Sequence, residues 1–172
     1  MDKLGEKSIR EFASDRGFPL IPLHYAMANG QCTCQKADCK HPGKHPREAD
    51  WPNKGMRAAE ALPIFKERYG SRLNVGVLTG PVSGILVIDV DPRSGGLETL
   101  ANWEAEHGPL PKTLTVQTGR FGDVRGRHLY FRYPNFEIGN KVGSIGQGID
   151  VRGKGGVIVA PGSLHASGVR YS

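Results

Sequence analysis

Apolar and polar residues follow two different periods along this chain, and together they predict its secondary structure. Apolar residues recur at helical spacing in residues 8–16, 58–69 and 97–107, which predicts three helices. Pro63 must lie in the first turn of the second helix or divide it, because proline has no N–H to donate. Other segments are short, apolar or alternating, and bounded by turn residues, which predicts strands. These segments are residues 19–25, 74–79, 85–91, 113–118, 128–133, 149–152 and 157–160.

The order of these segments predicts an α+β fold. Several strands follow one another with only a glycine-rich turn between them, which is typical of hairpins. We therefore expect a mainly antiparallel sheet with helices flanking it.

Several predicted strands have one apolar and one polar face, because side chains alternate and residues two apart point the same way. The strands that begin at Ile85, Thr113, His128 and Ile149 all follow this pattern, and Val116 lies on the apolar face of the second. If these strands belong to one sheet, we expect their chemically active residues to gather on one side of it. These residues are Asp89, Asp91, His128, Asp150 and Arg152.

Two carboxylates on one strand and a third on another form a set of hard oxygen donors. Such a set suits Mg²⁺ or Mn²⁺ carrying a polyphosphate, and metal ions of this kind can activate a hydroxyl and stabilise a leaving oxygen. Basic residues beside glycine-rich turns can hold the phosphates. The basic residues in such positions are Arg120, Arg125, Arg127, Arg152 and Lys154.

Each of these features also has a simpler interpretation. The Asp89–Asp91 pair can cap the turn at Pro92, and the same motif holds a nucleotide-sugar metal in glycosyltransferases. His128 alone is more often a structural histidine, and the glycine-rich turn at Lys154 can be a tight hairpin. That turn lacks the spacing and the final Ser/Thr of a Walker A loop.

Length and charge narrow the possible functions. The chain has 172 residues, which fits a single domain over residues 1–172, and its net charge of +6 favours a polyanionic partner. No apolar run is long enough for a membrane span, and the charged start lacks the apolar core of a signal peptide, so we expect a cytoplasmic protein with no membrane partner. The end, just after a Gly/Ser-rich turn, indicates a protein truncated at the C-terminus.

Taken together, these segments resemble the N-terminal domain of bifunctional DNA primase/polymerases, of the archaeo-eukaryotic primase superfamily. The resemblance rests on three motifs in the same order, in residues 88–91, 126–131 and 148–156, followed by residues 159–163, and it extends from about Gly17 to the end. It implies an RRM-like catalytic sheet, a divalent metal, NTP or dNTP substrates and a single-stranded DNA template.

The resemblance also implies roles for single residues. Asp89, Asp91 and Asp150 match the catalytic carboxylates, and His128 matches a histidine at the phosphates of the incoming nucleotide, where we also expect Arg127, Arg152 and Lys154. Many superfamily members have serine two residues before this histidine, whereas this chain has Gly126, so a backbone amide would take the place of that hydroxyl.

These features favour template-dependent nucleotidyl transfer during plasmid, phage or bacterial replication. A helicase domain or a replisome protein is an expected partner. Two alternatives stay open, a non-catalytic zinc-containing nucleic-acid-binding module and a metal-dependent nuclease. The three acids argue against the first, because a DNA-binding module gains nothing from carboxylates that face its anionic partner.

A loop at about residues 31–46 contains all three cysteines of the chain, Cys32, Cys34 and Cys39. In a reducing compartment such a cluster predicts a metal site rather than a disulfide, and structural Zn²⁺ takes four tetrahedral N or S ligands. His45 is the expected fourth ligand, because its Gly-Lys-His-Pro context recurs in related sequences, and His41 is the alternative. We expect the zinc to hold together a loop with few apolar residues.

Overall fold

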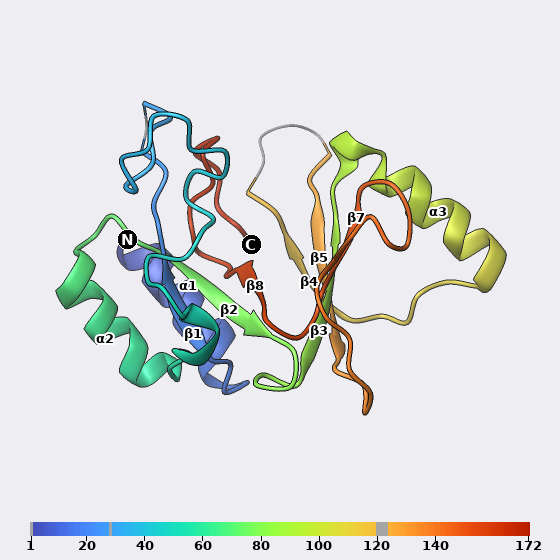
Figure 1. Ribbon diagram of the computed structural model, residues 1–172, viewed down its shortest axis with the longest axis horizontal. Helices are drawn as coiled ribbons and strands as arrows, with labels where there is room; N and C mark the ends of the chain where they lie inside the picture. The colour runs from blue at the N-terminus through green and yellow to red at the C-terminus, as the bar shows by residue number, and fades with distance from the viewer. Residues whose placement is uncertain (1, 28, 120–123) are drawn as a thin grey trace. The chain divides into compact units, whose positions relative to one another are not determined.

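The structure is a computed structural model of the chain, and it describes residues 2–27, 29–119 and 124–172. Within these ranges the chain forms an α+β fold with three α-helices and two sheets, which confirms the predicted fold class (Figure 1). It divides into two compact units, one of residues 1–78, 119–121 and 157–172 and one of residues 79–118 and 122–156. Arg120, expected at the phosphates, lies outside the described residues. No helix in the described ranges is long and apolar enough to cross a membrane.

The first unit contains a three-stranded sheet of order β1-β2-β8, formed by β1 (Leu20–Leu23), β2 (Asn74–Thr79) and β8 (Gly156–Val159). β1 pairs antiparallel with β2. The helices α1 (Lys3–Ser14) and α2 (Ala58–Tyr69) pack against each other in the same unit, and a 3₁₀ helix, η1 (Trp51–Asn53), precedes α2 (Figure 1). Its core consists of aliphatic side chains that are almost fully buried. They include Ile9, Leu20, Ile21, Leu23, Leu62, Val75 and Val77.

Both helices of this unit differ from the sequence-based expectation. α1 begins five residues earlier than predicted, because the carboxylate of Asp2 accepts the N–H of Gly5 at 2.9 Å and caps the helix. Pro63 neither begins nor divides α2; it lies inside a continuous helix. Proline removes the bond to the carbonyl four residues before it and crowds that carbonyl, which belongs to the exposed residue Ala59, where water can replace the lost donor.

The second unit contains a five-stranded antiparallel sheet of order β4-β5-β3-β7-β6. Its strands are β3 (Ile85–Val90), β4 (Leu114–Gln117), β5 (Arg127–Arg132), β6 (Lys141–Val142) and β7 (Ile149–Arg152). A 3₁₀ helix, η2 (Pro92–Ser94), follows β3 and leads into α3 (Gly96–His107).

One face of this sheet packs against α3. Val90, Leu129 and Ile149 from the three central strands form a buried cluster with Leu100 of the helix. Because side chains alternate, Asp89, His128 and Asp150, which neighbour these residues in the chain, lie on the opposite face. β3, β5 and β7 thus present Asp89, His128 and Asp150 on the side away from α3.

β4 departs from the predicted pattern. Val116 lies opposite His128 in the register, and Leu114 lies opposite Tyr130. Directly opposed residues share a face, so β4 brings its apolar residues to the side that holds His128. Its polar residues Thr115 and Gln117 therefore lie on the α3 side, because the register and not the composition of a strand decides which face it continues.

Candidate active site and metal centre

Three polar residues form one row across the central strands of the second unit. Asp89 on β3 lies directly opposite His128 on β5 and directly opposite Asp150 on β7. Opposed residues of antiparallel strands have Cβ atoms about 4.5–5.5 Å apart. The register therefore brings together two carboxylates and an imidazole that are separated by up to 61 residues in the chain, from Asp89 to Asp150.

Arg152 connects the two carboxylates of this row. One guanidinium nitrogen, Nη2, lies 2.7 Å from Oδ2 of Asp150 and 3.8 Å from Oδ2 of Asp89. The three side chains are between 24% and 29% exposed, so solvent reaches them. The carboxylates of Asp89 and Asp150 therefore converge on one cationic group.

His128 is turned toward the other side of the same aspartate. Its Nε2 lies 3.6 Å from Oδ1 of Asp89, and the residue is only 5% exposed. Asp89 therefore lies between an imidazole and a guanidinium, and its two oxygens face different partners.

A backbone group completes the surroundings of Asp150. The N–H of Gly143, in the turn after β6, donates to Oδ1 of Asp150 at 3.1 Å. Gly143 has a φ of +62°, a left-handed conformation that favours glycine. The sequence pattern does not predict this contact, because a backbone donor leaves no side-chain pattern. The positive φ of a glycine in a glycine-rich turn is its only signal.

Asp91 lies just past the end of β3 and caps the turn that follows. Its Oδ1 accepts the N–H of Arg93 at 3.1 Å at the start of η2. This contact matches the simpler interpretation of the Asp89–Asp91 pair, in which it caps the turn at Pro92. Among the residues that the structure describes, the three aspartates do not form a group whose oxygens all lie within 4.8 Å of one another.

Two of the predicted phosphate-binding residues lie away from the row. Arg127 is opposite Val90 and Gln117 in the register, so its position belongs to the α3 side of the sheet. Lys154 lies beyond the end of β7, and its Nζ is 2.5 Å from Oε2 of Glu137, which raises the pKa of the lysine. The structure thus gathers Asp89, Asp150, His128 and Arg152, and it does not bring Arg127 or Lys154 to them.

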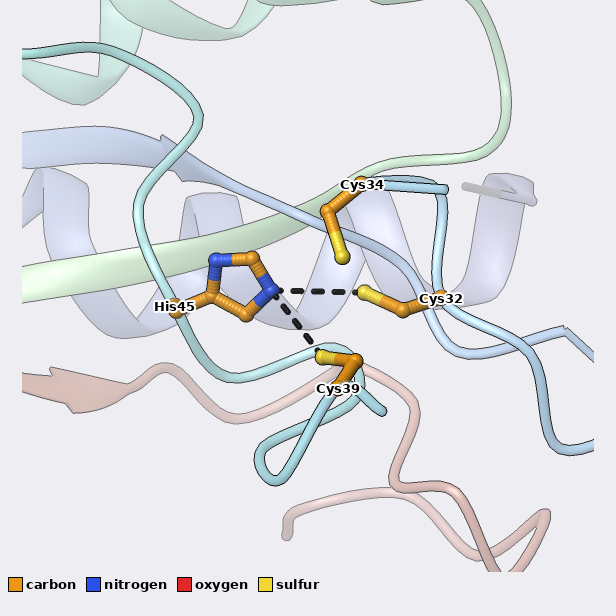
Figure 2. Close-up of side chains that lie close together, drawn as sticks. All are labelled: Cys32, Cys34, Cys39 and His45. Carbon is orange, nitrogen blue, oxygen red and sulfur yellow. Dashed lines mark hydrogen bonds between the residues drawn. The ribbon is translucent and has the colours of Figure 1, made fainter. Parts of the chain in front are cut away.

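A second cluster, in the first unit, consists of Cys32, Cys34, Cys39 and His45 (Figure 2). Their ligand atoms all lie within 4.8 Å of one another. Nε2 of His45 is 3.4 Å from the sulfurs of both Cys32 and Cys39. Ideal bond lengths of about 2.3 Å for Zn–S and 2.05 Å for Zn–N at a tetrahedral angle place S and N about 3.6 Å apart, close to the observed spacing. The four residues therefore fit a Cys₃His metal site, with His45 rather than His41 as the imidazole.

The loop around this cluster is fixed to the end of β1 by Thr33, the residue between the first two cysteines. The hydroxyl of Thr33 accepts the N–H of Tyr25 at 2.9 Å and the guanidinium of Arg47 at 3.0 Å. The N–H of His24 donates to the carbonyl of His45 at 2.9 Å. Both arms of the loop are thus tied to one segment, and the sequence signal for this arrangement is the threonine inside the Cys-x-Cys motif.

Burial lowers the pKa of two imidazoles at this cluster, His45 in the loop and His24 beside it. Burial is the main cause that lowers the pKa of His45, and burial followed by the nearby His45 lowers the pKa of His24 to about 4. The neutral imidazole is the form that binds a metal. The cluster therefore combines a suitable geometry with a suitable protonation state of its histidine.

A comparison against known protein families identifies the family of this chain. The family described as bifunctional DNA primase/polymerase, N-terminal, matches residues 10–172. This match covers both units of the fold, and within it lie the polar row and the cysteine loop. The chain therefore belongs to the bifunctional DNA primase/polymerase N-terminal family.

Proposed function

We propose that this chain transfers nucleotides from NTPs or dNTPs to a growing strand, directed by a single-stranded DNA template. The observation that carries the proposal is the row of His128, Asp89 and Asp150 across three neighbouring strands, with Arg152 beside it. The family is one of primases and polymerases, so this row is the natural place for its chemistry.

Asp89 and Asp150 fit a divalent metal by the chemistry of their donors. They offer carboxylate oxygens, the ligands that Mg²⁺ and Mn²⁺ prefer, and they already converge on one cationic group. Such metals, when bound, supply activation of the attacking hydroxyl and charge stabilisation at the leaving phosphate. Asp91 is the proposed third carboxylate, and its Oδ1 accepts the N–H of Arg93.

The cationic and imidazole groups of the row would hold the triphosphate. Arg152 can present two N–H donors to phosphate oxygens, because its planar guanidinium matches their geometry. His128 lies on the other side of Asp89, where its imidazole can hydrogen-bond a phosphate. Arg127 has a register position on the α3 side and Lys154 pairs with Glu137, so we assign them only the outer part of the phosphate site.

We also propose that Cys32, Cys34, Cys39 and His45 hold one structural Zn²⁺. All four positions are filled by protein, which leaves no open position for a substrate and is typical of a structural site. The net charge of +6 supports a nucleic-acid partner, and a helicase domain or a replisome protein would provide further template handling.

The proposal is tested by incubating the protein with single-stranded DNA, Mn²⁺ or Mg²⁺ and labelled nucleotides, with and without an annealed primer. Incorporation that depends on template and metal supports the proposal, and products without a primer identify primase activity. Degradation of the DNA without incorporation would instead indicate a metal-dependent nuclease, and binding without turnover a non-catalytic module.

A further inference from the structure

The carboxylate oxygens of the row already have partners, and this affects how a metal can enter. Oδ1 of Asp150 accepts the N–H of Gly143, and its Oδ2 lies 2.7 Å from Arg152. Oδ1 of Asp89 faces His128 at 3.6 Å, and its Oδ2 lies 3.8 Å from Arg152. Gly143 and Arg152 are within hydrogen-bond distance, both at Asp150, and a metal that takes Oδ2 of Asp150 meets the guanidinium of Arg152 there.

A guanidinium is a strong competitor for this position. An arginine side chain is not deprotonated in proteins, so its positive charge persists beside the carboxylates. The charges of Asp89, Asp150 and Arg152 sum to −1, whereas the two carboxylates alone would carry −2. The site thus offers a divalent cation only half of the negative charge that its two aspartates could supply.

A nucleotide changes this balance. Its triphosphate is a polyanion that an arginine can bind through two parallel hydrogen bonds. Arg152 is partly exposed, at 29%, so its side chain can turn from the carboxylates toward a phosphate without leaving the surface of the site. The movement frees Oδ2 of both aspartates at the moment when the phosphates arrive.

We propose that Arg152 competes with the divalent metal for Asp89 and Asp150, so that the metal binds tightly only together with the triphosphate. The inference rests on the proposed function for the identity of the anion, but the competition itself is a property of the protein without nucleotide. Arg152 therefore couples the occupancy of the metal site to that of the nucleotide site.

The test measures Mn²⁺ binding to the full, zinc-containing chain without nucleotide, by electron paramagnetic resonance of free Mn²⁺ and by calorimetry. We expect Arg152→Gln to bind Mn²⁺ about tenfold more tightly than the wild type, because a like charge within about 4–6 Å shifts a cation equilibrium by that order. Arg132→Gln is the matched control. Arg132 lies opposite Ile85, and Arg152 lies opposite Val87, two residues further along β3, so both arginines are on one face of the sheet. The control variant therefore loses the same charge on the same face. Asp150→Asn should abolish the binding and so assign it to this site.

The second arm adds a dATP analogue with an α,β-imido bridge, which binds but cannot be incorporated. It should increase the Mn²⁺ affinity of the wild type by a larger factor than that of Arg152→Gln, because the variant has no ion pair left to release. Circular dichroism of each variant checks the fold, and Arg152→Lys, which keeps the charge, should stay close to the wild type.

Three results would overturn the competition. One is unchanged or weaker Mn²⁺ binding by Arg152→Gln, which would make Arg152 a residue that positions the carboxylates. Another is an equal gain in Arg152→Gln and Arg132→Gln, which would be a general charge effect. The third is no binding by either protein without nucleotide. None of these results depends on incorporation, so failure of the proposed polymerase activity is recognised separately, by a wild type that binds Mn²⁺ but makes no product.

Discussion

At the scale of single residues, the surroundings of Asp91 separate a structural role from a chemical one. Its carboxylate caps η2 through the N–H of Arg93, and asparagine caps such a turn about as well as aspartate does. We expect Asp91→Asn to keep the free energy of unfolding within about 0.5 kcal/mol of the wild type and to abolish nucleotide incorporation, as Asp89→Asn should. Urea denaturation and a primer-extension assay measure the two properties, and near-normal incorporation by both variants would remove these aspartates from the site.

His128 is almost completely buried, and its Nε2 faces Asp89. Loss of a hydrogen bond to a charged phosphate costs about 1.5–3 kcal/mol, so His128→Ala should weaken nucleotide use about ten- to a hundredfold. DNA affinity should change little, because it depends on many backbone contacts by lysine and arginine. Steady-state kinetics and fluorescence anisotropy with single-stranded DNA separate the two effects, with His107→Ala on the exposed side of α3 as the control. Unchanged kinetics with strongly weakened DNA binding would place His128 on the template side.

Thr118, just past the end of β4, has a buried hydroxyl with no hydrogen-bond partner among the described residues. A buried polar group without a partner costs free energy, and valine has nearly the same shape without that group. Thr118→Val should therefore raise the free energy of unfolding by about 1 kcal/mol, whereas a Thr→Val change at a bonded hydroxyl lowers it. Thr33→Val, which removes a hydroxyl with three polar contacts, provides that comparison in urea denaturation. A destabilised Thr118→Val protein would show that this hydroxyl is satisfied in solution.

At the scale of elements, the segment after the cysteine loop is held to the end of α2 by one carboxylate. Oε1 of Glu48 accepts hydrogen bonds from the hydroxyl of Tyr69 at 2.5 Å and from the guanidinium of Arg68 at 2.8 Å. Nζ of Lys54 lies 3.6 Å from Oε2 of Glu48. The hydrogen bond from Tyr69 is the main cause that lowers the pKa of Glu48 below 4.5. Because the folded-state pKa is depressed, this stabilisation is complete above pH 4.5 and is lost as the pH falls through the lower folded value.

We therefore expect Glu48→Gln to lower the free energy of unfolding at pH 7 by about 1 kcal/mol and to have a smaller effect at pH 3. The figure stays near that of one hydrogen bond, because the partners Arg68 and Lys54 are exposed and screened by solvent. Urea denaturation at both pH values measures the difference. Glu67→Gln, an exposed change on α2, is the control. An equal loss at both pH values would contradict the role of the charge.

The same scale shows what the sequence could predict. Alternation within β3, β5 and β7 was enough to place Asp89, His128 and Asp150 on one face, because these strands have one clearly apolar side that must be buried. β4 could not be placed in this way, since its side is decided by pairing with β5 and not by its own residues. The contact of Gly143 with Asp150 was equally inaccessible, because it depends on the conformation of a turn.

The cysteine loop was more predictable than the fold around it. A metal site imposes a strict count of ligands within a short segment, so Cys32, Cys34 and Cys39 could be grouped from their spacing alone. The choice between His41 and His45 needed the structure. His45 is brought to the sulfurs because its carbonyl accepts the N–H of His24 at the end of β1, a contact between segments that local spacing does not show.

At the scale of the whole molecule, the two candidate sites belong to different compact units. The cysteine cluster lies in the unit of β1, β2 and β8, and the polar row lies in the unit of the five-stranded sheet. Asn74 of β2 connects the cysteine loop to the segment around Leu164 in the same unit, since its side chain donates to the carbonyls of Gly43 at 2.9 Å and Leu164 at 2.7 Å. We therefore expect loss of the metal to destabilise the loop first and then the segment around Leu164.

The purified protein should contain one zinc per chain by elemental analysis, and its removal should have a local effect. Structural zinc provides folding free energy to a segment that has few apolar residues of its own, and within residues 31–46 Cys32 is the one buried hydrophobic residue. After chelation, or in Cys34→Ser, hydrogen exchange should therefore accelerate in residues 31–46 and in the segment that Asn74 holds. β3, β5 and β7 should keep their protection, because their core is the separate cluster of Val90, Leu129 and Ile149 with α3. His45→Ala should lose the metal as Cys34→Ser does, whereas His41→Ala should retain it. A structural role confined to the first unit would be contradicted by a well-folded wild type without zinc, or by an equal loss of protection in both units.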